Sequence, residues 1–153
     1  MSNLTFSVSG QSLSQTQLNA RTLDFNILVD QPESFGDRNE APSPVEYILA
    51  GLAGCVNVVA HLVADELQIK VSNLRIDVSG TLNTDKFLGK FTLERAGFLS
   101  IFVNIKAATD ASDEKLTKWL SIIETRCPVK DTLGGSTPIS LSLKRKVLEK
   151  HCV

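Results

Sequence analysis

Two of the three cysteines in this chain stand in sequence contexts that suit thiol chemistry. Cys55 ends an almost wholly apolar stretch that begins after Ser43, and Cys127 opens a turn in front of Pro128. Neither belongs to a CxxC motif, and cysteines of a reducing compartment are more often catalytic, metal-binding or buried than structural bridges. One thiol is thus expected deep in a packed helix and the other at a helix start, which favours a dithiol redox centre over a scaffold disulfide.

The helical neighbours of Cys55, three and four residues away, are all apolar: Gly51, Leu52, Val58 and Val59. Burial among such side chains would raise the pKa of Cys55 and leave it inert unless a cation comes from elsewhere in the fold. Arg38, in the loop that leads into the helix, is the first candidate for this cation, and Arg21 and Arg126 are the others. Spacing alone leaves open the alternative of a small cysteine packed in the core.

Cys127 occupies the predicted cap position of a short helix that begins at Pro128 and stops before Gly134. Its sulfur would face free N–H groups at the positive end of that helix, and Arg126 adds a positive charge, so the setting favours a thiolate. Such a thiol is a good leaving group in disulfide exchange. A helix-capping cysteine without a chemical role is the alternative. Cys152, near the C-terminus, is expected to be an exposed thiol of no consequence.

Glu46 is explained first by helix capping, because Ser43 is a good N-cap, Pro44 fits the first helical position and Glu46 completes a capping box. It lies nine residues before Cys55, which is half a turn around the helix, so the two side chains face opposite ways. Glu46 would reach the thiol only through a neighbouring chain or a bend. His61 falls about a third of a turn from Cys55 and is not expected to act as its base.

The elements that must position these residues indicate an α+β fold with a mainly antiparallel sheet around a long buried central helix. That helix is predicted from Ser43 to about Leu67, and its small residues at positions 50, 51, 53 and 54 suggest tight contact with another helix, within or between chains. Two strands are predicted from apolar alternation within the first thirty residues, one over 4–8 and one over 23–29, with a turn at 9–12. Further elements are strands over 71–82 and 139–147, a strand or hairpin over 91–107 and a helix over 112–126.

Composition sets the remaining limits. With 153 residues and a hydrophobic fraction of 42%, the chain is expected to form a single domain over residues 1–153. The net charge of −1 gives no electrostatic case for nucleic acid or an anionic membrane as a partner. No secretory signal is visible, and the longest apolar run, 47–56, is short of the ~20 residues of a membrane helix, which predicts a cytoplasmic protein. Zinc has weak support, since the chain has two histidines and no close ligand pair.

The two cysteine segments together are recognisable. The segment from Pro44 to Cys55, followed after an α+β stretch by the segment from Arg126 to Leu133, resembles the OsmC/Ohr family of osmotically inducible and organic hydroperoxide resistance proteins. The loop 29–36 and the segment 137–140 also look like that family, so the likeness covers most of the chain from Phe25 onward.

The resemblance implies an intertwined homodimer, with the long helices at its centre and two active sites at the interface. It also implies thiol peroxidase chemistry on an organic hydroperoxide, without a metal or bound cofactor. Cys55 would attack the peroxide and become a sulfenic acid, Cys127 would resolve it as a disulfide, and an external dithiol would reduce that disulfide. In better-characterised branches an arginine activates the first thiol and a glutamate directly after the helix-starting proline holds that arginine. Arg38 and Glu46 are the candidates here.

The chain departs from that pattern at two places. Val45 occupies the position of the glutamate, with Glu46 one step later, and Lys130-Asp131 replaces the common small-polar pair. These departures keep open the alternative that the protein is a non-catalytic dimer that binds an apolar ligand or senses redox state. An elevated pKa of Cys55 would favour that alternative. Other thiolate chemistry, such as acyl transfer, lacks a placed base.

Overall fold

The structure of the protein is a computed structural model that describes residues 3–35, 39–109 and 111–135. A three-stranded antiparallel sheet comes first, in the order β1 (Ser9–Ser12), β2 (Leu18–Thr22) and β3 (Phe25–Val29). A short 3-10 helix η1 (Glu33–Phe35) then precedes the long helix α1 (Pro44–Glu66). An antiparallel pair, β4 (Val71–Thr81) and β5 (Ser100–Thr109), is followed by helices α2 (Asp113–Arg126) and α3 (Pro128–Gly134). The predicted α+β class is confirmed.

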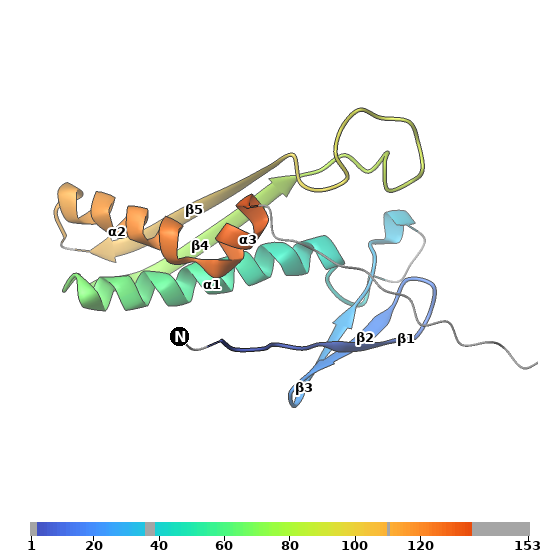
Figure 1. The fold of residues 1–153 in the computed structure, drawn as a ribbon, viewed down its shortest axis with the longest axis horizontal. Helices are drawn as coiled ribbons and strands as arrows, with labels where there is room; N and C mark the ends of the chain where they lie inside the picture. The colour runs from blue at the N-terminus through green and yellow to red at the C-terminus, as the bar shows by residue number, and fades with distance from the viewer. Residues whose placement is uncertain (1–2, 36–38, 110, 136–153) are drawn as a thin grey trace, which may run out of the picture.

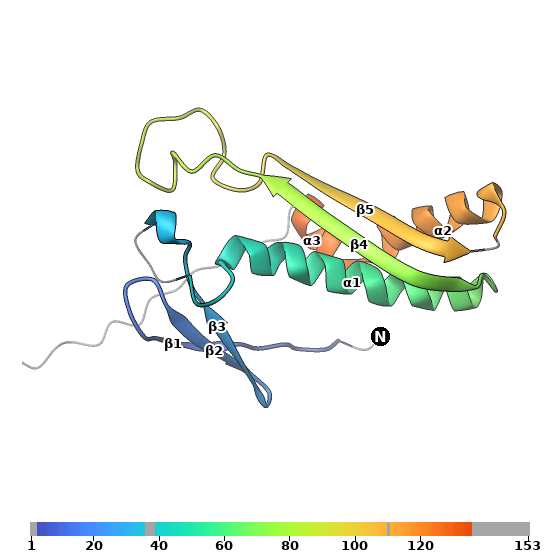
Figure 2. The same ribbon diagram turned by 180° about the vertical axis from the view of Figure 1, so that it is seen from behind.

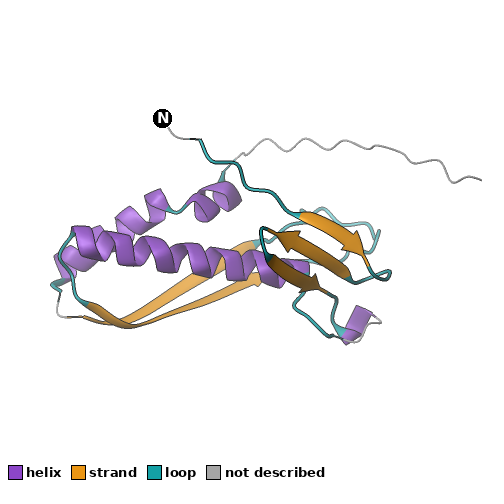
Figure 3. Ribbon diagram, turned by 90° about the horizontal axis from the view of Figure 1, so that it is seen from below, coloured by secondary structure: helices purple, strands orange, loops and turns teal. Residues whose placement is uncertain are grey.

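Helix α1 is the axis of the molecule. The β4–β5 ribbon runs along its length, and α2 and α3 lie beside it, as Figures 1 and 2 show from opposite sides. The β1–β3 sheet lies at the end of the molecule where α1 begins (Figure 3). The loop between β4 and β5 projects at that same end. Three of the elements that follow α1 in the sequence, β4, α2 and α3, therefore pack back onto it.

The bounds of α1 follow from its caps, as predicted. Ser43 is the N-cap and Pro44 the first helical residue. The Glu46 carboxylate accepts hydrogen bonds from the Ser43 N–H and hydroxyl, both at 2.7 Å, which satisfies a donor that the helix start leaves unpaired. The helix ends at the C-cap Leu67, after which Gln68 turns the chain with a φ of 53°.

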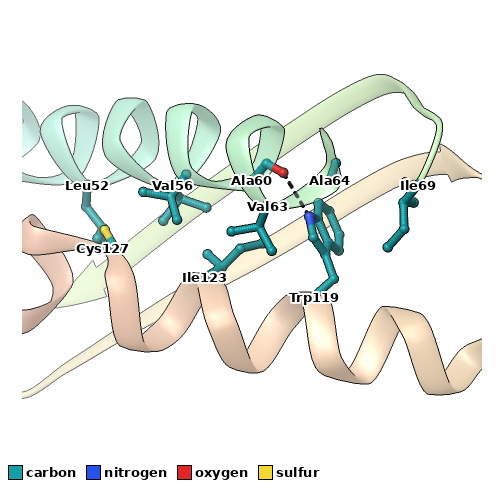
Figure 4. Close-up of a cluster of buried hydrophobic side chains, with 10 residues drawn as sticks. Leu52, Val56, Ala60, Val63, Ala64, Ile69, Trp119, Ile123 and Cys127 are labelled. Carbon is teal, nitrogen blue, oxygen red and sulfur yellow. Dashed lines mark hydrogen bonds between the residues drawn. The ribbon is translucent and has the colours of Figure 1, made fainter. Parts of the chain in front are cut away.

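One side of α1 builds the core. Six of its residues are buried and contact Ile69, Trp119, Ile123 and Cys127; they are Leu52, Val56, Val59, Ala60, Val63 and Ala64. The indole N–H of Trp119 donates to the carbonyl oxygen of Ala60 at 2.8 Å, so a buried polar group of α2 is satisfied by the backbone of α1 (Figure 4). This bond and the surrounding packing join the two helices.

The other side of α1 is uncovered within one chain. A line of side chains at helical spacing faces outward, and we call it the open stripe: Ile48, Gly51, Cys55, Val58 and Leu62. Val58 and Leu62 are 57% and 51% exposed. A Cβ added at Gly51 or Gly54 would meet no atom within 4 Å, so the predicted tight contact at the small residues does not form within one chain.

By length and composition α1 is apolar enough to cross a membrane, with a mean hydropathy of 1.9 over its most apolar window. The core helix of a soluble protein meets the same criteria. Here α1 is the helix around which the ribbon and the other two helices are arranged.

The N-terminal strand predictions are partly wrong. Residues 9–12, predicted as a turn, form β1, and β2 was missed. The apolar alternation of Leu4, Phe6 and Val8 does not form a strand, and these side chains are 66–88% exposed. The turn lies instead around Ser14, whose hydroxyl accepts from the N–H groups of Thr16 and Gln17.

The C-terminal half agrees better with the sequence predictions. The bounds of β4, α2 and α3 are confirmed within one or two residues. β5 begins at Ser100 rather than at 91, because the chain before it forms a loop closed by the Asn83–Glu94 hydrogen bond at 2.6 Å and the Asp85–Lys90 ion pair at 3.4 Å. The strand predicted over 139–147 lies outside the described residues.

The junction of α1 with α2 gives the first prediction. Trp119→Ala should lower the free energy of unfolding by about 3–5 kcal/mol, because it opens a cavity at the helix contact. Trp119→Phe keeps most of the packing and should cost only about 1–2 kcal/mol, through the loss of the hydrogen bond to Ala60. Urea denaturation at fixed protein concentration measures both.

The matched control is Leu93→Ala, which removes a side chain that is 92% exposed and should change stability by less than about 0.5 kcal/mol. Equal stability of Trp119→Ala and Leu93→Ala would show that Trp119 does not hold α2 on α1.

Candidate functional site

The structure brings the two candidate thiols together. The Sγ atoms of Cys55 and Cys127 lie 3.0 Å apart, although the residues are 72 positions apart in the sequence, and both thiols are free. A disulfide bond is about 2.05 Å long. A covalent bond between these sulfurs therefore requires a shift of only about 1 Å from the observed positions.

The antiparallel arrangement of α1 and α2 sets this distance. Lys115, at the start of α2, donates from its ammonium group to the Leu67 carbonyl at the end of α1. One turn further along α2, the Trp119 indole N–H donates to the Ala60 carbonyl. Cys127 follows directly after the last residue of α2. Helix α2 ends there because Cys127 adopts an extended ψ of 107° and Pro128 begins α3. The sulfur of Cys127 consequently sits at a corner that faces the middle of α1.

Cys127 is the more buried of the two thiols, with 1% of its surface exposed. It is the N-cap of α3, and its Sγ accepts the N–H of Lys130 at a distance of 3.5 Å. The cap position predicted from the sequence is thus observed. An N–H donor at the sulfur stabilises negative charge there, as the helix start also does.

Cys55 is half-buried and lies in the middle of the open stripe, so the expected order of burial is reversed. Burial raises the pKa of Cys55, and its hydrogen bond with Cys127 and the charge of that neighbour raise it further. The backbone N–H of Val129 acts in the opposite direction, because it stabilises the thiolate.

The candidate arginines do not reach Cys55 within the described part of the chain. Arg21 donates from Nε to the Leu23 carbonyl in the β2–β3 turn, and Arg126 forms an ion pair with Glu66 at 2.6 Å that raises the pKa of Arg126. Arg38 lies outside the described residues. Among the groups that the structure describes, those that shift the pKa of Cys55 include no cation.

Glu46 does not join the thiols within one chain. Its bonds to Ser43 lower the pKa of its carboxyl group and account for its position. It borders a separate hollow of about 490 Å³ between α1 and β4, together with Asp77 and five apolar side chains. The role of Glu46 at the thiols stays a prediction that would need a second chain.

A cavity of about 610 Å³ opens beside Cys127, and sequence reasoning missed it. Its floor consists of buried residues, namely Leu52, Val56, Ile123 and Cys127, while Leu99, Leu120, Glu124, Lys130 and Leu133 on its rim are exposed. Cys55 is not among the residues that line it. Phe98 reaches the rim because Gly80 leaves room for its ring: a Cβ at Gly80 would lie 2.6 Å from that ring.

No group of three or more His, Cys, Asp or Glu side chains that could hold a metal ion occurs within residues 3–35, 39–109 and 111–135.

A fold of this kind is known in other proteins. A family model described as OsmC-like protein matches residues 36–142, and the chain belongs to this family. Two relatives are named hydroperoxide reductase. The protein of Mycoplasma genitalium is 24% identical over 128 residues, which cover 84% of this chain and 86% of that protein. The protein of Mycoplasma pneumoniae is 25% identical over 100 residues, which cover 65% and 67%.

The fold is shared with a solved structure, the OsmC like protein from Mycoplasma pneumoniae. The two agree with a TM-score of 0.75 at 21% identity, and the match covers 88% of this chain and 90% of that one. The predicted OsmC-like fold is therefore confirmed.

The coupled thiols give a prediction about pH dependence. Cys127→Ala should lower the pKa of Cys55, because it removes the neighbouring sulfur that raises that pKa. A lower pKa means a larger thiolate fraction at neutral pH, so alkylation of Cys55 by iodoacetamide should become faster and its pH profile should move to lower pH.

The comparison is made between Cys152→Ser and the double variant Cys127→Ala/Cys152→Ser, so that Cys55 is followed without the third thiol. A profile that moves to higher pH would show instead that Cys127 stabilises the Cys55 thiolate.

Proposed function

We propose that the protein is a thiol peroxidase that reduces organic hydroperoxides. The observation that carries this proposal is the distance of 3.0 Å between the sulfurs of two free cysteines on different helices. The relatives named hydroperoxide reductase support it at the level of the family.

In the first step the Cys55 thiolate attacks an oxygen of the O–O bond. An S–O bond forms, the O–O bond breaks, and the leaving alkoxide takes a proton and departs as an alcohol, so that Cys55 becomes a sulfenic acid. In the second step the Cys127 thiolate attacks the Cys55 sulfur. The S–S bond forms, the S–O bond breaks, and hydroxide takes a proton and leaves as water. An external dithiol then reduces the disulfide.

The surroundings of the two sulfurs support this division of roles. Cys55 is half-exposed and can meet a peroxide, whereas Cys127 is 1% exposed and faces Cys55. The Val129 N–H stabilises the thiolate that the first step needs. The Lys130 N–H at Cys127 stabilises the thiolate that the second step needs.

Apolar side chains on both sides of Cys55 along the open stripe favour an organic hydroperoxide over hydrogen peroxide. The same stripe supports a homodimer. A second copy would cover Ile48, Val58 and Leu62, which are 41–57% exposed, and the open space at Gly51 and Gly54 would let its helix approach closely. In that dimer the Cys55 site lies at the interface.

The first step requires a thiolate, and the described chain alone raises the pKa of Cys55. A cation must therefore complete the site. We assign this role to Arg38, with Glu46 of a second copy as its partner, because Arg21 and Arg126 are engaged elsewhere in the described chain. The thiols must also be kept reduced between turnovers, which fits the cytoplasm.

Two observations favour the second candidate function, a non-catalytic dimer that binds an apolar ligand. The pKa of Cys55 is raised, and an apolar cavity of about 610 Å³ lies within the size range of small-molecule sites. A peroxidase and a binding protein differ in whether hydroperoxide consumes the thiols.

The test uses cysteine variants in a coupled assay with cumene hydroperoxide and dihydrolipoamide. Cys55→Ser should abolish both the first reduction and turnover, because the attacking thiolate is gone. Cys127→Ser should reduce one equivalent of peroxide and then lose turnover, because no second cysteine converts the sulfenic acid into the disulfide that the dithiol reduces. Cys152→Ser is the matched control and should keep full turnover.

The same assay tests the cation. Arg38→Ala should retain all thiols but slow the first reduction by about tenfold or more, because an opposite charge near a thiol shifts its pKa by about one to three units. Arg21→Ala should keep the wild-type rate. Turnover by Cys55→Ser, or an unchanged rate in Arg38→Ala with loss of rate in Arg21→Ala, would contradict the roles assigned here.

A further inference from the structure

One acidic side chain in the N-terminal half of the protein is completely buried. Asp30, directly after β3, has 0% of its surface exposed, and it is the only charged residue that is buried in the part of the chain that the structure describes. Burying a carboxylate is costly unless hydrogen-bond donors replace the water that it loses. The hydrogen-bond partners of Asp30 therefore identify the part of the fold that this charge holds in place.

These partners lie at both ends of the segment that joins β3 to α1 (Figure 1). One carboxylate oxygen of Asp30 accepts the Gln31 N–H at 2.8 Å, at the start of the segment. The other oxygen accepts the Glu40 N–H at 2.9 Å, near the end of the segment. The N–H of Asp30 itself donates to the Pro42 carbonyl at 3.2 Å. A single residue therefore closes the segment 31–41 into a loop with fixed ends.

A side chain from the β1–β2 turn reinforces this closure. The Gln17 amide nitrogen donates to the Asp30 carboxylate at 3.1 Å and to the Glu40 carboxylate at 2.9 Å. It thus joins two carboxylates that would otherwise repel each other. A buried polar network of this kind specifies one arrangement, because the buried charge is satisfied only while its donors stay in place.

The loop is fixed to the start of α1 as well. Tyr47, in the first turn of α1, donates from its hydroxyl to the Leu28 carbonyl in β3 at 2.7 Å. The N-cap Ser43 is 4% exposed and is held by Glu46. The two ends of the loop, the end of β3 and the start of α1 therefore keep one relative position.

We propose that Asp30 is a positioning residue for the thiol chemistry and acts through the loop whose ends it joins. This proposal rests on the proposed function, which assigns to Arg38 the cation that stabilises the Cys55 thiolate. Arg38 is two residues before Glu40 in the sequence, and two residues of chain span at most about 7 Å. The hydrogen bond from the Glu40 N–H to Asp30 therefore limits how far Arg38 can move from this anchor.

The benefit of such an anchor is a smaller loss of entropy. A cation on a free loop would lose conformational entropy each time it approached the thiolate, whereas a loop with closed ends has lost much of that entropy on folding. The cation then stays near the sulfur for a larger fraction of the time, and a nearby positive charge lowers the pKa of a thiol. Asp30 would thus counter the rise in the pKa of Cys55 that burial causes, without contacting that thiol.

The alternative is a loop anchor that serves stability alone. It predicts that substitution of Asp30 destabilises the protein and leaves the pKa of Cys55 unchanged. The pKa of Cys55 therefore separates the two roles, whereas a loss of stability is common to both.

The test measures the pKa of Cys55 in protein that lacks the other two thiols, Cys127→Ala/Cys152→Ser. The rate of alkylation by iodoacetamide is followed against pH with and without Asp30→Asn. Asparagine keeps the size of the side chain but offers one oxygen in place of two, so it cannot accept at both ends of the loop. We expect alkylation at neutral pH to slow by about three- to tenfold, which corresponds to a pKa higher by about half to one unit.

A double-variant cycle ties this effect to the cation of the loop. Arg38→Ala alone should raise the pKa of Cys55. Asp30→Asn added to Arg38→Ala should raise it no further, because no cation is left to position. An unchanged or lower pKa in Asp30→Asn would overturn the proposal, and so would additive effects of the two substitutions.

Two further variants keep the test valid if Asp30→Asn does not fold. Gln17→Ala removes a donor to the same anchor and should raise the pKa of Cys55 by a smaller amount. Asp85→Asn is the matched control, because it breaks a carboxylate contact within another loop, the ion pair with Lys90, and should leave that pKa unchanged. Equal pKa values of Cys55 in Gln17→Ala and Asp85→Asn would also overturn the proposal.

The pKa measurement needs no hydroperoxide, so this proposal and the proposed function fail separately. If cumene hydroperoxide leaves the wild-type thiols intact while the cycle of Asp30 and Arg38 behaves as expected, the peroxidase is refuted and the positioning role stands. If hydroperoxide consumes the thiols while Asp30→Asn leaves the pKa of Cys55 unchanged, the peroxidase stands and the positioning role is refuted.

Discussion

The antiparallel contact of α1 with α2 is the constraint on which the site depends. The Trp119 indole N–H donates to the Ala60 carbonyl, and the Lys115 ammonium group donates to the Leu67 carbonyl. Cys127 is the residue that caps the end of α2. Because the two cysteines are 72 residues apart, nothing local holds them together. Their separation of 3.0 Å is set by the register of two helices, so a change in the packing around Trp119 acts directly on the chemistry of the thiols.

The site combines two demands that oppose each other. Packing the thiols together partly buries Cys55 and raises its pKa, while attack on a peroxide needs the thiolate. Two backbone N–H groups at the start of α3 donate to the sulfurs, that of Val129 to Cys55 and that of Lys130 to Cys127. The remaining stabilisation of the Cys55 thiolate is assigned to the proposed cation, in a site completed by the proposed second chain. The open stripe around Cys55 is consistent with this, because an apolar surface of this kind is otherwise unusual on a soluble chain.

The sequence was sufficient where local rules act alone. The cap residues Ser43 and Pro44 predicted the start of α1, and Pro128 predicted the start of α3 after Cys127. The sequence was insufficient where a segment needs a neighbouring strand to form a sheet. The apolar alternation of residues 4–8 looked like a strand but has no strand beside it in the described chain. Burial was the hardest to predict, because the composition of α1 does not tell which face is covered. That is why Cys55 was expected deeper than Cys127, and why the cavity at Cys127, which needs β5, α2 and α3 together, was missed.

The most direct test of the dithiol centre is a single-equivalent reaction of the reduced wild-type protein with cumene hydroperoxide. Free thiols are counted with a chromogenic disulfide and the products are mapped by peptide mass. Loss of two thiols, with a bridge between Cys55 and Cys127 formed faster than with hydrogen peroxide, is the result expected from sulfurs 3.0 Å apart in apolar surroundings. Retention of all three thiols, or a bridge that includes Cys152, would contradict it.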